Sequence, residues 1–144
     1  MTKTLVLSLV LSLFAIANAR AEADREVRNC SDANLGIESI VLPAKSFYNG
    51  QVNVFVTDTV EPAAASFGLA IVTPDFADPV GGSNCRAITH LSGVDINKIK
   101  SSYDSDKGLL LTVPYRVYNG EGTEPAKAPL KIRINLKKQS VVLE

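Results

Sequence analysis

Hydrophobic and polar residues alternate along much of this chain, and a period of two predicts β-strands rather than helices. The clearest run is 130–136, with the sequence LKIRINL, in which four aliphatic side chains share one face. Residues 109–118 alternate in the same way, except that Pro114 cannot donate a ladder hydrogen bond and so marks an edge or a bulge. Further strands are predicted at 35–42, 47–48, 51–56, 67–72, 85–91 and 141–143.

One turn and one ambiguous segment refine this pattern. Asn49-Gly50 lies between two strands and favours a hairpin with a type I′ turn, in which Val52, Val54 and Val56 share one face. The segment 94–103 fits two interpretations, because its apolar residues have helical spacing and Asp95 could cap a short helix. The strong strand that follows favours a strand over 98–103 instead.

Short strands separated by turn signals, without a long helical pattern or an internal repeat, predict a single all-β domain over 30–144. We expect an antiparallel β-sandwich of about 7–9 short strands held by one disulfide. An immunoglobulin-like topology is one form of such a sandwich, although the chain has no Trp to fill the core position typical of antibody domains. A small β-barrel is the alternative.

The first 19 residues have the pattern of a cleaved secretory signal peptide. Lys3 precedes an apolar run over 5–17, and Ala17-Asn18-Ala19 supplies a small-x-small cleavage site. The run is shorter than the about 20 apolar residues of a spanning helix, so no integral membrane segment is expected after cleavage. Residues 20–29 are predicted to form a flexible polar arm, and the protein is expected to be periplasmic or extracellular.

Two cysteines, Cys30 and Cys85, are predicted to form one structural disulfide, as an even number does in an exported protein. Closing a loop of this length stabilises a domain by about 4 kcal/mol in the chain-entropy model. The spacing is not the C-x-x-C of a redox-active pair.

Charge and composition exclude several functions. The chain has fifteen basic and fifteen acidic side chains, and this balance argues against nucleic acid as a partner. His90 is the single histidine, and in 85–91 it alternates with Ile88 and is expected to share its face. With both cysteines in a disulfide, no zinc or copper set remains, and no cofactor is expected.

A weak calcium candidate occurs at Asp104 and Asp106, which alternate ahead of Gly108. A third acid and the distal bidentate Glu are missing. A hairpin turn whose Asp side chains accept backbone hydrogen bonds is the simpler interpretation, and it also fits Asp75 and Asp78. The sequence contains no nucleophile or phosphate-loop motif, so no catalytic residue is assigned.

A row of basic residues is the preferred binding candidate. Lys131, Arg133 and Lys137 are predicted to project from one strand face, with about 6.6 Å between successive outward positions. Such a row fits a sulfated or phosphorylated glycan, or an acidic protein patch. Alternatively, the charges protect an edge strand from aggregation. The loops 74–84 and 119–129 are also expected to meet at one end and to carry recognition.

These observations favour an exported, non-enzymatic binding or adaptor module that recognises a protein or a glycan through loops or the basic strand. A structural or assembly subunit of a surface or periplasmic complex is the alternative. The arm 20–29 lacks the alternating apolar pattern of a donated strand, which counts against that class. A small hydrolase using carboxylates ranks third.

Overall fold

Antiparallel strands form three sheets in the computed structural model, which describes residues 25–60, 62–78 and 80–144. The sheet orders are β1-β5-β4-β3-β2, β12-β11-β8-β7 and β10-β9-β6. The strands are β1 Arg28–Asn29, β2 Ile40–Phe47, β3 Val52–Asp58, β4 Phe67–Pro74, β5 Ser83–Leu91, β6 Gly93–Val94, β7 Lys100–Asp104, β8 Gly108–Val113, β9 Tyr115–Tyr118, β10 Thr123–Pro125, β11 Leu130–Asn135 and β12 Ser140–Leu143. Two short 3-10 turns are η1 Ile37–Ser39 and η2 Ile96–Lys98. The all-β antiparallel prediction is confirmed.

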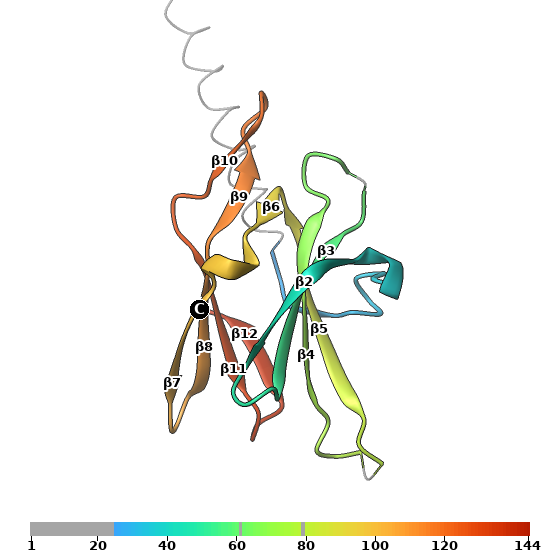
Figure 1. The fold of residues 1–144 in the computed structure, drawn as a ribbon, viewed down its shortest axis with the longest axis vertical. Helices are drawn as coiled ribbons and strands as arrows, with labels where there is room; N and C mark the ends of the chain where they lie inside the picture. The colour runs from blue at the N-terminus through green and yellow to red at the C-terminus, as the bar shows by residue number, and fades with distance from the viewer. Residues whose placement is uncertain (1–24, 61, 79) are drawn as a thin grey trace, which may run out of the picture.

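The five-stranded and four-stranded sheets form two layers with the core between them (Figure 1). Alternating side chains from both layers fill this core, as the period of two requires. The fully buried ones include Val52, Val54, Leu69, Ile71, Ile88, Leu111, Val113, Ile132 and Ile134. The sheets stay open at their edges, so the arrangement is sandwich-like and the barrel alternative is wrong.

The β2–β3 hairpin follows its sequence closely. Asn49 and Gly50 have φ angles of 55° and 80°, and Gln51 N–H donates to the Tyr48 carbonyl at 3.2 Å. Positive φ at both central residues is what a type I′ turn requires. The shared inward face of the three valines is also confirmed, since Val52 and Val54 are 0 % exposed.

Two strands begin later than predicted, each because a 3-10 turn precedes it. The turn η1 displaces β2 from 35–42 to Ile40–Phe47, and β2 then contains a bulge between Val41 and Ala44. In 94–103 both interpretations are partly right, because Asp95 caps η2 by accepting from Asn97 N–H at 3.1 Å, and β7 then runs to Asp104.

Pro114 separates two strands that belong to different sheets. β8 ends at Val113 in the four-stranded sheet, and β9 begins at Tyr115 in the three-stranded sheet. The predicted break is therefore confirmed. The predicted loop 119–129 is partly wrong, because Asn119 Oδ1 accepts the N–H groups of Glu121 and Gly122, which makes a tight turn and lets β10 pair back onto β9.

Residues 30–39 form a strap across the outer face of the five-stranded sheet (Figure 1). The strap joins β1 at one edge to β2 at the opposite edge, so it must cross the sheet. Ala70 and Ala87 alternate with core residues and so point outward, yet they are 4 % and 1 % exposed. The outer face of the sheet is therefore covered at these two positions.

The Cys30–Cys85 disulfide fixes the start of the strap to β5, with a Cα–Cα distance of 5.4 Å. This confirms the predicted bond, which is consistent with an oxidising, exported location.

The predicted signal peptide 1–19 and the first part of the arm, 20–24, lie outside the described residues. The described remainder of the arm contacts the domain: Val27 packs against the core, and the Arg25 guanidinium lies 4.7 Å from the Tyr115 ring centroid. Within the described part of the chain, no helix has the length and apolar character needed to cross a membrane.

Candidate functional site

Four turns lie at one end of the sandwich, which we call the hairpin end. They are 48–51, 75–82, 105–107 and 136–139 (Figure 1). Tyr48 and Tyr103 are in contact there, and Asn84 Nδ2 donates to Gln139 Oε1 at 2.7 Å, which joins the two layers. The turn 119–122 lies at the opposite end (Figure 1), so the expectation that the loops 74–84 and 119–129 share an end is wrong. Pro114 sends the chain to the third sheet, which extends away from the hairpin end.

An exposed pair of tyrosines bridges the two layers at this end. Tyr48 follows β2 and Tyr103 lies on β7, and their rings stack with centroids 5.1 Å apart and 22° between the planes. The hydroxyls lie 3.4 Å apart, and this hydrogen bond raises the pKa of Tyr103. Tyr48 is 41 % exposed and Tyr103 is 53 % exposed. Rigid aromatic surface with a polar tip is typical of recognition surfaces.

Exposed apolar and basic side chains lie on the other turns of this end. Phe76 and Val80 are exposed on the 75–82 turn. Lys107 and Lys137 are exposed on the two neighbouring turns. Lys137 also lines a small cavity of about 50 Å³ together with both tyrosines. The hairpin end therefore combines aromatic, aliphatic and positively charged groups.

The predicted basic row does not form as a row. β11 ends at Asn135, so Lys137 lies in the turn 136–139 and its placement on the strand is wrong. Arg133 Nε and Nη2 donate to the two carboxylate oxygens of Glu144 at 2.9 and 3.0 Å, which occupies this side chain in an ion pair. Lys131 is exposed on β11. β11 lies between β8 and β12, so the alternative of an edge strand protected by charge is also wrong.

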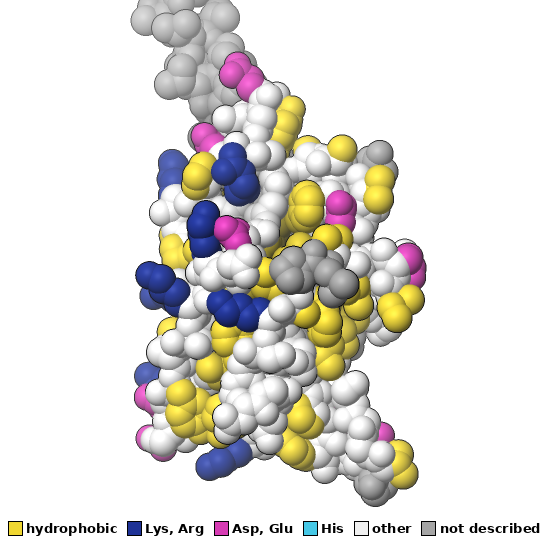
Figure 2. Space-filling view, viewed as in Figure 1, with side chains coloured by type: hydrophobic (Ala, Val, Ile, Leu, Met, Phe, Trp, Pro, Cys, Tyr) yellow, Lys and Arg dark blue, Asp and Glu magenta, His cyan; other side chains and the backbone are white. Residues whose placement is uncertain are grey.

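On the face drawn in Figure 2, the basic side chains are spread out rather than aligned. Figure 2 shows Lys and Arg on the half of this face that carries the four-stranded and three-stranded sheets, with gaps between them. In the sequence, Leu136 and Lys137 continue the alternation of apolar and polar residues, although the backbone turns after Asn135. The pattern therefore predicted a strand that was too long. Asn135 marks the end of the strand: its side chain accepts from Lys138 N–H at 3.0 Å.

The aspartates of the weak calcium candidate stabilise a turn. Asp104 Oδ1 accepts the N–H groups of Lys107 and Asp106 at 2.8 and 2.9 Å, and these bonds hold the pKa of Asp104 below its usual value. Asp75 and Asp78 accept from Ala77 N–H and Val80 N–H, both at 3.0 Å. The turn interpretation is thus confirmed. Among the residues with described placement, no group of three or more His, Cys, Asp or Glu side chains could hold a metal ion.

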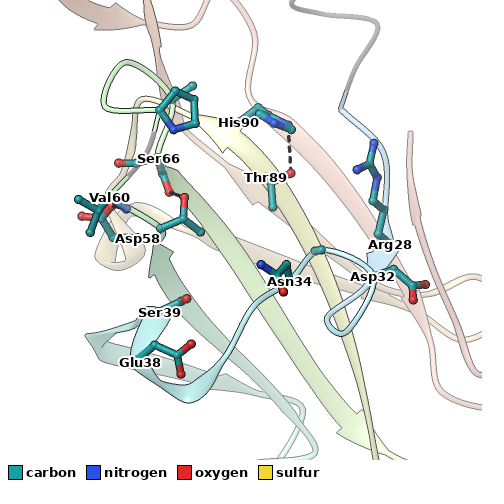
Figure 3. Close-up of a pocket in the computed structure, with 14 residues that line it drawn as sticks. Arg28, Asp32, Asn34, Glu38, Ser39, Asp58, Val60, Ser66, Thr89 and His90 are labelled. Carbon is teal, nitrogen blue, oxygen red and sulfur yellow. Dashed lines mark hydrogen bonds between the residues drawn. The ribbon is translucent and has the colours of Figure 1, made fainter.

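A larger hollow of about 560 Å³ lies on the outer face of the five-stranded sheet (Figure 3). The strap, the end of β3 with the residues that follow it, and the end of β5 form its walls. Its charged lining residues are Arg28, Asp32, Glu38 and Asp58, and His90 lies at its rim. None of these was assigned to a site from the sequence, because the strap brings them together across strands.

A β-bulge turns His90 toward this hollow. On β5, Thr89 and His90 together oppose the single residue Gly68 of β4, and His90 has φ 63°. Ile88 and Leu91 therefore both face the core at 0 % exposed, while His90 is exposed. The expectation that His90 shares the face of Ile88 is wrong. The sign of this bulge in the sequence was Gly68, opposite the bulged residues. A side chain would not fit there, because its Cβ would lie 2.5 Å from the Ile88 carbonyl oxygen.

Two more lining residues have left-handed backbones. Asn34 has φ 53°, and Val60 has φ 68°, which is a real outlier for a β-branched residue. The Asp58 carboxylate accepts from Val60 N–H at 2.9 Å and holds this conformation. Strained backbone tends to cluster at binding sites, where the surrounding structure enforces it.

No protein family, no curated protein and no solved structure matches this chain significantly. The functional assignment therefore depends on the geometry of these two surfaces.

Proposed function

We propose that this protein is an exported, non-enzymatic binding module that recognises a protein or glycan partner with its hairpin end. The observation that carries the proposal is the stacked, exposed Tyr48–Tyr103 pair across the two layers. Large aromatic side chains with restricted rotamers gain contact area at low entropic cost, so they dominate many recognition surfaces. The disulfide and the signal-like leader support the exported location.

The charged rim indicates the chemistry of the partner. Lys107 and Lys137 beside the tyrosines favour an acidic protein surface or an anionic glycan, since complementary charge speeds association and selects partners. Lys137 thus remains a candidate binding residue, but as part of a turn. Lys131 and Arg133 lie on β11, the strand that precedes this turn. Arg133 already forms an ion pair with Glu144.

A capture experiment with matched variants tests the proposal. The oxidised protein from residue 20 to 144 serves as bait against the exported fraction of the source organism, beside the double variant Tyr48→Ala/Tyr103→Ala. The control is Tyr118→Ala, which removes another exposed tyrosine from β9 at the opposite end. We expect a partner that binds the wild type and the control but binds the double variant at least 10-fold more weakly.

Equal capture by all three baits would refute recognition by the hairpin end. The structural-subunit alternative predicts self-association instead, which sedimentation of the purified protein at high concentration detects. The hydrolase alternative predicts turnover that is lost on substitution of the carboxylates in the hollow.

A further inference from the structure

The hollow on the outer face has the size of a small-molecule site. Its volume of about 560 Å³ lies within the range of about 300–1,000 Å³ that is common for ligand pockets. It lies on the outer face of the sheet and shares no lining residue with the hairpin end. Macromolecular recognition at the tyrosine pair therefore leaves this second surface unexplained.

The charged side chains of the hollow lie in two groups on opposite sides. Figure 3 shows Arg28 and Asp32 on one side, and Glu38 and Asp58 on the other. Among the described lining residues, three carboxylates face one guanidinium, so the interior favours a ligand with positive charge. The side with Glu38 and Asp58 suits a cation. Arg28 suits a carboxylate, because a guanidinium binds carboxylate oxygens with parallel N–H donors.

The remaining contacts of Arg28 are compatible with this role. Its Nε pairs with Glu26, which leaves the four N–H bonds of the terminal nitrogens as separate donors. Asp32 accepts from Asn29 Nδ2 at 2.8 Å, which engages this carboxylate within the strap. The two acids on the opposite side are therefore the stronger candidates for binding a cation.

The uncharged lining limits the ligand class further. Ser39 and Ser66 are buried hydroxyl-bearing residues, and Thr89 Oγ1 lies 3.1 Å from His90 Nδ1. The described lining contains no Phe, Tyr or Trp, and its one aromatic ring is the His90 imidazole at the rim, so a sugar ring or a nucleobase would find little stacking surface there. Small polar ligands that carry their own charges fit this lining better.

We propose that the hollow binds a basic amino acid with a free carboxylate, either as the free molecule or as the C-terminal residue of a peptide. The ligand carboxylate binds Arg28, and the cationic side chain lies between Glu38 and Asp58. The left-handed backbones at Asn34, Val60 and His90 hold the walls in this arrangement before the ligand arrives.

Titration of the oxidised mature chain with four probes tests the ligand class, using calorimetry or NMR shifts. The probes are L-arginine, L-citrulline without the side-chain charge, agmatine without the carboxylate, and L-glutamate with the opposite side-chain charge. L-Arginine should bind, citrulline and agmatine should each bind at least 10-fold more weakly, and glutamate should not bind. The peptide Gly-Gly-Arg distinguishes a C-terminal residue from the free amino acid, and binding by either form supports the proposal.

A matched pair of variants tests the residues. Asp58→Asn keeps the oxygen that accepts from Val60 N–H but removes the charge, and it should weaken L-arginine binding at least 10-fold. Asp75→Asn is the control, because Asp75 also accepts from the N–H two residues later but lies at the hairpin end. In Arg28→Gln, L-arginine and agmatine should bind equally.

Three results would overturn the proposal. They are a dissociation constant for L-arginine and for Gly-Gly-Arg weaker than about 10 mM, equal binding of arginine and citrulline, and equal effects of Asp58→Asn and Asp75→Asn. The variant Tyr48→Ala/Tyr103→Ala should leave arginine binding unchanged, so the two surfaces can fail independently.

Discussion

Thr57 carries a buried hydroxyl whose removal should stabilise the protein. The side chain is 0 % exposed on β3, and its Oγ1 has no hydrogen-bond partner among the described residues. Folding thus removes a hydroxyl from water without replacing its hydrogen bonds, which costs about 1–3 kcal/mol. Valine has the same branched shape with a methyl in place of the hydroxyl, so Thr57→Val should raise the free energy of unfolding by about 1–3 kcal/mol.

The residue opposite Thr57 on the neighbouring strand has no side chain. Gly68 faces Thr57 on β4, and a Cβ on that glycine would lie 2.8 Å from Thr57 Oγ1. Because Gly68 has no side chain, the methyl meets no neighbouring Cβ there. The substitution therefore changes polarity without bringing two side chains together at this cross-strand position.

Urea unfolding of the oxidised protein provides the assay. The chain has four Tyr and no Trp, so tyrosine fluorescence or circular dichroism follows the transition. With a slope of about 1–3 kcal/mol per molar urea, the midpoint should rise by about 1 M at constant slope. Thr57→Ser is the control: it keeps the hydroxyl, loses the methyl, and should lower the midpoint. A midpoint for Thr57→Val at or below that of the wild type would refute the reasoning, since it would mean that the hydroxyl is hydrogen bonded in solution.

Two further predictions concern the strap and the ion pair. The double variant Cys30→Ala/Cys85→Ala should lose about 4 kcal/mol of unfolding free energy in the same assay, because the bond closes a loop with a sequence separation of 55; unchanged stability would contradict this. The Arg133 guanidinium holds the pKa of Glu144 below its usual value, so this pair stabilises the fold above pH 4.5 and loses its effect as the pH falls through the lowered pKa. Glu144→Gln should therefore be less stable than the wild type at pH 7 and equally stable at pH 2, and a difference independent of pH would count against the pair.

The predictable parts of this structure are those set by neighbouring residues. The β2–β3 turn followed from Asn49-Gly50, because only certain residues tolerate positive φ at both positions. The inward valines followed from the pleat, and the break at Pro114 followed from its missing N–H. The disulfide followed from two cysteines in a chain expected to be exported.

The candidate surfaces depend on contacts between distant segments, which no local pattern encodes. Tyr48 and Tyr103 meet because a hairpin of one layer lies beside a hairpin of the other. The hollow exists because the strap crosses a sheet whose strands come later in the chain. The bulge at His90 reversed the alternation on β5, and the turn at 136–139 removed Lys137 from the strand without a Gly or Pro to signal it.

The strap is also the first part of a loop that the disulfide closes covalently. Cys30 is synthesised 55 residues before Cys85, and the chain has no third cysteine with which either could pair wrongly. The two cysteines lie side by side in the folded sheet, because Cys85 lies on β5 and Cys30 follows β1, which pairs with β5. The bond closes a covalent loop that contains β2, β3 and β4, so the strap stays attached at the β5 side of this sheet even when the hydrogen bonds between strands open.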